Sequence, residues 1–257
     1  MTRWKLTIEH DGRPYVGWQR QAEGASVQQE IEEAILKFSG ETVRLHAAGR
    51  TDAGVHALGQ VAHFDLQRPS DSHTVREAIN AHLRPQPIAV VSADPVDDHF
   101  HARMSARRRR YRYIILNRPA RPTLDIGRAW HLAHRLDVPA MREGAAHLIG
   151  QHDFSSFRAS ECQAKSPVKT LDQLDIVEDG AYLKFEVSAR SFLHHQVRNM
   201  VGTLALVGRA KWTPDDVAQA LAARNRTAGG PTAPPDGLYL VGVDYPQLPD
   251  DVQDTIS

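Results

Sequence analysis

The stretch GRTDAGVH, residues 49–56, holds one carboxylate, Asp52, in a short loop between Gly49 and Gly54. A glycine on each side lets the backbone turn sharply and approach a ligand closely. Two interpretations are open from this loop alone: Asp52 caps a turn through its own backbone, or it reaches a bound molecule. Arg50 favours the second, because a nearby cation stabilises the ionised form that a nucleophile or base requires, although surface pairs of this kind are common and weak.

Two extended segments flank this loop. Val43, Leu45 and Ala47 alternate before it, and residues 60–66 carry a mostly extended pattern after it. A strand at about 3–10, helices at 27–38 and 74–83, and an apolar run at 88–91 complete the first half. The resulting order of strand, helix, strand, strand, helix, strand is the ferredoxin-like arrangement.

The second half predicts the same order with one added helix. Its strands are expected at about 107–117, 174–176, 183–187 and 238–243, and its helices at 138–149, 193–208 and 214–221. Asp179-Gly180 is a strong hairpin signal. We therefore predict an α+β fold of two ferredoxin-like (RRM-like) βαββαβ halves, residues 1–104 and 105–257, with mainly antiparallel sheets and a catalytic cleft between them.

Composition sets broad limits on the protein. The 257 residues are 41% hydrophobic and 24% charged, with a formal net charge of zero. A single cysteine, Cys162, excludes an internal disulfide and any cysteine-rich metal site, which fits a reducing compartment such as the cytoplasm. No apolar run approaches a signal segment or a membrane span, so we expect neither export nor membrane association.

Basic residues concentrate in one short region of the chain. Six cations fall within ten residues: Arg103, Arg107, Arg108, Arg109, Arg110 and Arg112. Such a run is usually a solvated face. Here Tyr111 and Tyr113 interleave with the arginines, and cations beside stackable rings suit a polyanion that carries bases. Zero net charge argues against indiscriminate nucleic-acid binding, but it permits one basic cleft.

Polar residues also occur where a helix should be partly buried. Gln196, Arg198 and Asn199 lie within the stretch FLHHQVRNMV, residues 192–201. Either Arg198 is solvated on an ordinary amphipathic helix, or it projects into the cleft and pairs with Asp52, because a buried arginine requires a carboxylate.

Four ordered motifs resemble the tRNA pseudouridine synthase I family, the TruA type. The first is the Asp52 loop followed by Gln60-Val61, and Tyr15 with the stretch GWQR at 17–20 is similar to that family's N-terminal segment. The other three are FHAR at 100–103 with RYRY at 110–113, FLHH at 192–195 with VRNM at 197–200, and GLYL at 237–240. The match runs from about residue 3 to 245, while residues 119–135 and the acidic tail from about 247 match nothing.

The resemblance implies an enzyme that isomerises uridine to pseudouridine at positions 38–40 of the tRNA anticodon stem-loop. It implies a homodimer without a cofactor, with Asp52 as the nucleophile. Attack on the ribose C1′, addition to C6 and removal of a ribose proton all remain open for that carboxylate. A base in a stem is out of reach, so the uridine would be flipped into a pocket.

The other site residues follow from the same resemblance. Tyr111 would stack on the uracil and help to remove its C5 proton, and Arg198 would hold Asp52 ionised and oriented. Arg50 would fill the space left by the base or grip a phosphate. Leu238 and Leu240 would form an apolar wall, with core packing as the alternative for either. Four arginines would contact RNA phosphates: Arg103, Arg108, Arg109 and Arg110.

Two rival functions remain. The fourteen histidines, including the pair His194-His195, invite a metal site, but no established ligand spacing occurs, so we expect no metal. The second rival is a noncatalytic RNA-binding module, because ferredoxin-like halves resemble the RRM sheet. The aromatic signature of such sheets is absent, and a binder would not need Asp52 between two glycines.

Overall fold

The computed structural model describes residues 1–246, so the acidic tail from about 247 lies outside the described residues. Within them the chain forms one ten-stranded sheet in the order β4-β1-β3-β10-β5-β9-β8-β7, with β2 paired to β3 and β6 paired to β5. The elements are β1 (Thr2–His10), α1 (Val27–Ser39), β2 (His46–Ala47), β3 (His56–Leu66), α2 (Ser72–Leu83), β4 (Ile88–Val96), β5 (Arg108–Asn117), β6 (Trp130–Leu132), α3 (Val138–Ala146), β7 (Gly150–Asp153), β8 (Val168–Asp179), β9 (Tyr182–Ala189), α4 (Gln196–Gly208), α5 (Pro214–Ala223) and β10 (Leu238–Asp244).

The first half is built on alternating residues, as predicted. Trp4, Leu6 and Ile8 of β1 are buried, and β1 pairs antiparallel with both β3 and β4. Helix α1 begins where the Ser26 side chain accepts a hydrogen bond from the Gln29 N–H. Its buried residues, which include Ile31 and Ile35, pack in the same apolar core as the β1 residues. The buried face of strand β1, with its period of two, and the buried face of helix α1, with its period of 3.6, therefore lie in the same core.

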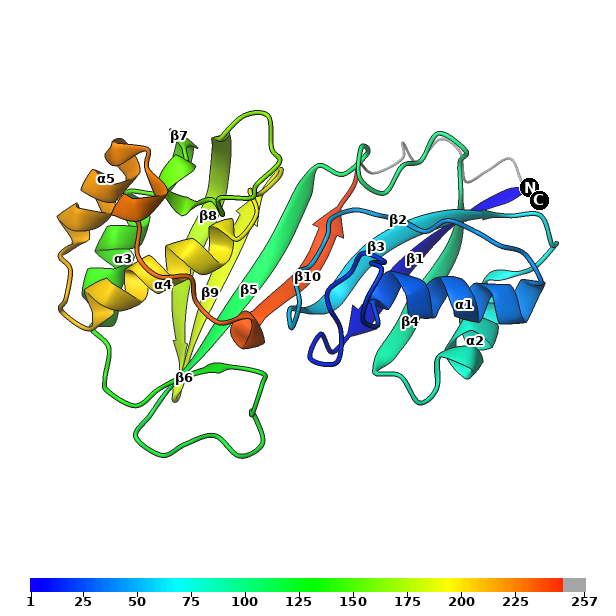
Figure 1. Cartoon of the computed structure of the whole chain (residues 1–257), viewed down its shortest axis with the longest axis horizontal. Coiled ribbons are helices and arrows are strands. Elements are labelled where there is room, and N and C mark those ends of the chain that lie inside the picture. Colours follow the sequence, from blue (N-terminus) through cyan, green and yellow to red (C-terminus); the bar gives the residue numbers. More distant parts are fainter. Residues whose placement is uncertain (247–257) are drawn as a thin grey trace.

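The second half is centred on β5, which lies between β10 and β9. Strands β8 and β9 form the predicted hairpin, and Gly180 in its turn has φ 60°. Helices α3, α4 and α5 contact one another and bury Met141, Leu204 and Val217. These helices gather at one end of the molecule and α1 and α2 at the other, with β5 and β10 between them (Figure 1).

The two halves share one sheet. Strand β10, from the end of the chain, pairs parallel with β3 through Tyr239 opposite His56 and Leu240 opposite Ala57. Because β2 pairs only with Ala62 and His63, it leaves the first residues of β3 free to bond β10. Val55 also packs in the core of the second half. The loop that carries Asp52 therefore lies at the junction of the halves.

Several predicted boundaries shift. Helix α3 ends at Ala146, and Gly150, expected to stop it, begins β7 with φ 99°. Helix α4 begins at Gln196 instead of 193, because His195 adopts a left-handed conformation with φ 60°. Among the described residues, no helix has both the length and the apolar character that a membrane crossing needs.

Candidate active site

The Asp52 loop is held on two sides. The Trp18 N–H donates to the Thr51 carbonyl oxygen at 2.9 Å, and Asp52 itself forms an isolated bridge with Gly17. On the other side Gly54 meets the short 3₁₀ turn Pro235–Gly237 that precedes β10. Gly54 has φ 77°, and a Cβ built on it would lie 2.9 Å from Pro235 Cγ. The second glycine of the motif therefore allows both the turn and the close approach to the C-terminal strand.

We expect Gly54→Ala to destabilise the protein more than Gly40→Ala does. Both glycines have nearly the same left-handed φ, 77° and 76°, but a Cβ at Gly40 meets nothing within 4 Å. The difference isolates the overlap with Pro235, worth about 1 to 3 kcal/mol of unfolding free energy. Denaturant unfolding of the two variants measures it, and equal losses would show that the loop does not press on the Pro235 turn.

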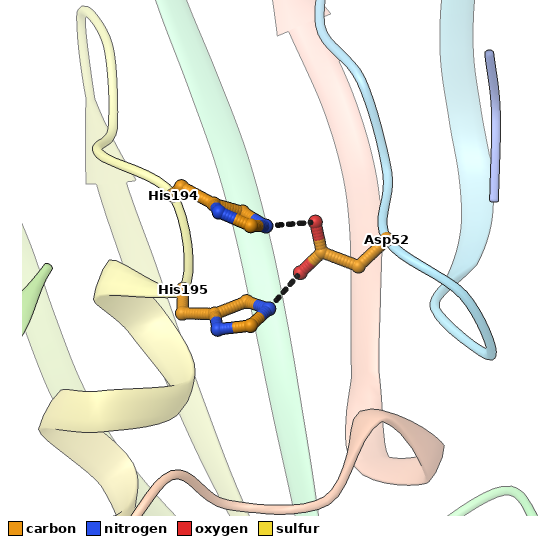
Figure 2. A group of neighbouring side chains, drawn as sticks. All are labelled: Asp52, His194 and His195. Atoms are coloured by element: carbon orange, nitrogen blue, oxygen red, sulfur yellow. Dashed lines mark ion pairs between the residues drawn. The ribbon is translucent and has the colours of Figure 1, made fainter. Parts of the chain in front are cut away.

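Three side chains from the other half surround the Asp52 carboxylate. Arg198 Nη1 lies 3.4 Å from Oδ2, so the predicted contact between Asp52 and Arg198 is confirmed. His195 Nε2 lies 3.3 Å from the same oxygen, and His194 Nε2 lies 3.2 Å from Oδ1. Figure 2 shows the two imidazole rings reaching across from the segment before α4 to the carboxylate. Asp52 keeps 24% of its side-chain surface exposed, which leaves a ligand a way in.

The buried polar residues of α4 fix this geometry. Gln196 Oε1 accepts from the Leu193 N–H at 2.8 Å, which closes the turn that presents the histidines. Arg198 Nε donates to the Ala233 carbonyl oxygen at 2.8 Å, and this bond aims the other end of the guanidinium at Asp52. Asn199 Nδ2 donates to the Phe157 carbonyl oxygen at 2.9 Å. Arg198 and Asn199, which looked misplaced in the sequence, are thus satisfied by main-chain oxygens and hold the start of α4 in place, whereas Gln196 Nε2 has no hydrogen-bond partner among the described residues.

The pKa of Asp52 is lowered below its usual value. Burial pushes this pKa up, but the hydrogen bond from His195 and the charges of His195, His194 and Arg198 together outweigh burial. The carboxylate is therefore ionised near neutral pH, as a nucleophile requires.

Tyr111 lies close to this carboxylate. Its ring stands edge-on to Phe192 with the centroids 5.1 Å apart. Burial and, to a smaller extent, the negative charge of Asp52 raise the pKa of Tyr111 to about 12. The phenol is therefore neutral at pH 7.

The two predicted wall residues are buried in this structure. Leu240 is opposite Tyr111 and Leu238 is opposite Tyr113 in the pairing of β10 with β5. Leu238 is 6% exposed and belongs to the core of the second half, while Leu240 is 0% exposed. Leu240 therefore lies beside Tyr111 on the neighbouring strand, and Leu238 packs in the core.

The cations beside Asp52 differ from those that the loop suggested. Arg50 is exposed, and the charges that lower the pKa of Asp52 come from His195, His194 and Arg198. Arg50 lies in the loop, two residues before Asp52, but its side chain is exposed. The favourable electrostatics are supplied from the opposite half of the chain.

Strand alternation divides the arginine cluster, and the prediction for Arg109 is wrong. Arg109, predicted to contact phosphate, is only 9% exposed and donates to the carbonyl oxygens of Ala48, Arg103 and Arg190 at 2.9, 2.8 and 2.6 Å. It shares the inward face of β5 with Tyr111, so it ties main-chain segments together instead. Arg108 and Arg110 face outward, about half exposed, near Asp172 and Asp244 at 3.8 and 3.1 Å, and Arg103 is exposed.

Asp52, His194 and His195 have the ligand types of a metal site. Their donor atoms all lie within 4.8 Å of one another. However, the Arg198 guanidinium occupies the same oxygen as His195, and a fixed positive charge there opposes a bound cation. The arrangement suits an ion-paired carboxylate better than a metal centre.

Sequence reasoning missed the two histidines as partners of Asp52. It named His194 and His195 only within a motif and as metal candidates. A signal was present, because His195 precedes Arg198 by three residues and residues so spaced at a helix start can face the same way. Because Arg198 was expected to face Asp52, His195 could have been predicted to face it as well.

Comparisons with known proteins identify the family of this chain. Residues 7–104 and 145–246 match the family model described as tRNA pseudouridine synthase. A protein of Rhodospirillum centenum named tRNA pseudouridine synthase A is 60% identical over 95% of this chain and 100% of its own length. Proteins of the same name from Paramagnetospirillum magneticum and Rhodospirillum rubrum are 60% and 58% identical over 95% and 96% of this chain, and over 96% and 88% of their own lengths.

A solved structure titled "Crystal Structure of a Cbf5-Nop10-Gar1 Complex" aligns with 79% of this chain and 45% of its own chain, at 12% identity and a TM-score of 0.37, too low to carry an argument. The family model and the relatives carry the assignment, since the model covers Asp52 and the start of α4 and the relatives cover 95% or more of the chain. This chain belongs to the tRNA pseudouridine synthase family, whose members are isomerases.

Proposed function

We propose that this protein isomerises uridine to pseudouridine at positions 38–40 of the tRNA anticodon stem-loop, with Asp52 acting on a flipped-out nucleotide. One observation carries the proposal: an ionised, half-buried carboxylate at the junction of the halves, contacted by Arg198 and both histidines and close to Tyr111. A noncatalytic RNA-binding module would have no use for such an arrangement.

The chemistry required fits these groups. In the reaction the bond from ribose C1′ to N1 breaks, the base turns, a bond from C1′ to C5 forms, the C5 proton leaves, and N1 takes up a proton. An ionised Asp52 suits attack on C1′, addition to C6 or removal of a ribose proton. For Tyr111 a neutral phenol suits stacking and hydrogen bonding, whereas removing the C5 proton requires the phenolate, which a pKa of about 12 disfavours.

The surroundings would support base flipping. Exposed Arg50, two residues from Asp52, is free to enter the space that the uridine leaves or to grip a neighbouring phosphate. Leu240 would hold the tyrosine ring from behind. Arg103, Arg108 and Arg110 would contact phosphates, which position an RNA without reading its sequence.

We expect Arg108→Ala and Arg109→Ala to change different properties, RNA binding in the first variant and stability in the second. Arg108→Ala should weaken RNA binding and lower the slope of log affinity against log salt by about 0.7 to 0.9, with little change in stability. Arg109→Ala should lower the unfolding free energy by about 2 kcal/mol, because it strips three carbonyl oxygens of their donor. Salt titrations and denaturant unfolding measure both. A lower salt slope in Arg109→Ala without a loss of stability would show that Arg109 contacts RNA after all.

Further features belong to the same proposal. Both halves would be ferredoxin-like, divided near residues 104 and 105. The strand orders β4-β1-β3-β2 and β10-β5-β9-β8 support this division, because each runs fourth, first, third, second once the additional short strands β6 and β7 of the second half are set aside. A homodimer, a cytoplasmic location and the lack of a cofactor rest on the family resemblance.

Tritium release tests the proposed reaction. An unmodified tRNA transcript that carries [5-³H]uridine should lose tritium to water when incubated with the purified protein, because C5 exchanges its hydrogen for the new glycosidic bond. An anticodon stem-loop transcript with cytidine at positions 38–40 is the matched control. Tight binding of the tRNA transcript without tritium release would favour the noncatalytic module.

A further inference from the structure

The two oxygens of Asp52 are held unequally. Oδ2 lies against two nitrogen donors, His195 Nε2 and Arg198 Nη1, at 3.3 and 3.4 Å, whereas among the described residues Oδ1 pairs only with His194 Nε2, at 3.2 Å. The Arg198 side chain is 12% exposed and is tied to the Ala233 carbonyl oxygen. His194 is 38% exposed and also lies 3.8 Å from the exposed Glu161. Oδ2 therefore has two partners, one of which is tied to the main chain, whereas Oδ1 faces an exposed side chain that also has an acidic neighbour.

The backbone at His195 explains how its ring reaches the carboxylate. His195 is the N-cap of α4 and has φ 60°, a left-handed conformation that non-glycine residues adopt infrequently. Its side chain makes no capping hydrogen bond to the helix. The Nε2 atom instead contacts Asp52, as Figure 2 shows. A residue at a helix start that forgoes its capping bond is directed to another partner.

We propose that His195 is a positioning residue for catalysis: with Arg198 it fixes Oδ2 of Asp52, and Oδ1, faced by the more exposed His194, is the oxygen that reacts. The proposal rests on the proposed isomerase function for the identity of the reaction. His195 acts through Asp52 and does not touch the nucleotide. A single defined orientation of the carboxylate keeps its free oxygen aimed at the flipped nucleotide.

Three substitutions of His195 separate this role from a backbone role. His195→Gln keeps an N–H donor near the position of Nε2. His195→Asn keeps one only near Nδ1, but asparagine is among the residues that best tolerate a left-handed φ. His195→Ala removes the donor. If the ring positions Asp52, glutamine is the best replacement; if only the turn conformation matters, asparagine is the best.

Single-turnover rates at saturating RNA give the comparison. We expect His195→Ala and His195→Asn to be about 10- to 100-fold slower than the wild type, as for the loss of a hydrogen bond to a charged group. We expect His195→Gln to lie within about threefold of it and RNA affinity to be unchanged in all three. Full activity in His195→Ala or His195→Asn, or a loss of affinity that matches the loss of rate, would overturn the proposal.

A second measurement does not depend on activity. An NMR titration of the Asp52 carboxyl carbon in the free protein should give a higher pKa in His195→Ala than in the wild type, because a stabilising donor is gone. Arg198, His194 and Tyr111 also face the carboxylate and remain in both proteins. An unchanged pKa of Asp52 would overturn the proposal even in a protein that releases no tritium, whereas absent tritium release with a raised pKa would overturn only the proposed function.

His147→Ala is the matched control. His147 and Asp215 form an exposed pair of the same residue types at 4.0 Å in the second half. Exposed pairs of this kind contribute little. We expect wild-type rates and an unchanged Asp52 pKa in this variant, and changes equal to those of His195→Ala would show that the effect is not specific to the site.

Discussion

Asp52→Asn is expected to abolish pseudouridine formation, with a loss of at least about 10⁴-fold in rate, while tRNA affinity stays near that of the wild type. The amide has almost the same shape, so the loop and its bridge to Gly17 should persist. It lacks the charge that the chemistry uses, and its NH₂ group would face a donor from His194 or from Arg198. Tritium release and filter binding with the same transcript measure the two effects.

Asp65→Asn controls for the loss of an ion-paired aspartate elsewhere. Asp65 on β3 pairs with Arg3 on β1 at 2.7 Å. We expect this variant to keep its activity and lose at most about 1 kcal/mol of stability. Retained activity in Asp52→Asn, or an equal loss in Asp65→Asn, would remove Asp52 from the reaction.

Arg198→Ala is expected to slow pseudouridine formation by about 100- to 1,000-fold, with a much smaller effect on RNA affinity. Removing one partner of a desolvated pair costs more than removing an exposed one, and here the charge left behind is the carboxylate that we propose acts on the nucleotide. The pKa of Asp52 should rise in this variant, so activity should be lost at a higher pH as the solution is acidified. This sign follows because a carboxyl group with a lowered pKa loses its charge only when the pH falls through that value.

Arg198→Lys tests the geometry of this pair. Lysine keeps the charge but cannot donate to the Ala233 carbonyl oxygen and to Asp52 Oδ2 through one rigid fork. We expect an intermediate rate in steady-state and single-turnover assays. Equal losses of rate and RNA affinity in Arg198→Ala would instead identify Arg198 as a phosphate contact.

Much of the local structure could be read from the sequence because it depends on near neighbours. Alternation identified β1, and Asp179-Gly180 identified the β8–β9 hairpin. Thr213 caps α5 with the expected proline and acids in its first turn. In each case the decisive contacts lie within a few residues. Boundaries that depend on a backbone conformation, such as the left-handed His195, shifted by a few residues.

Long-range pairing could not be read in the same way. Two residues of β10 join β3 and make one sheet of both halves, and no local pattern specifies that partner. Arg109 was misassigned for a related reason. Its place in a basic run suggested an exposed cation, whereas strand alternation puts it on the same face as Tyr111, where the carbonyl oxygens of Ala48, Arg103 and Arg190 satisfy it.

The candidate site was predictable in outline and incomplete in detail. Asp52 and Arg198 were expected to touch because one needed a cation and the other a carboxylate. The two histidines were not predicted as partners of Asp52, because neutral and charged imidazoles serve many roles and the charges of Asp52 and Arg198 already balanced each other. Arg50 drew attention through its proximity in sequence, although the loop turns its side chain to solvent.

Position-resolved mapping of pseudouridine tests the central claim most directly. An unmodified tRNA transcript with uridine at positions 38–40 is incubated with the wild-type protein or with Asp52→Asn, and pseudouridine is located by chemical sequencing. We predict conversion at those positions, and nowhere else in the transcript, by the wild type and none by the variant. Conversion by both proteins, or conversion confined to other positions, would contradict the account.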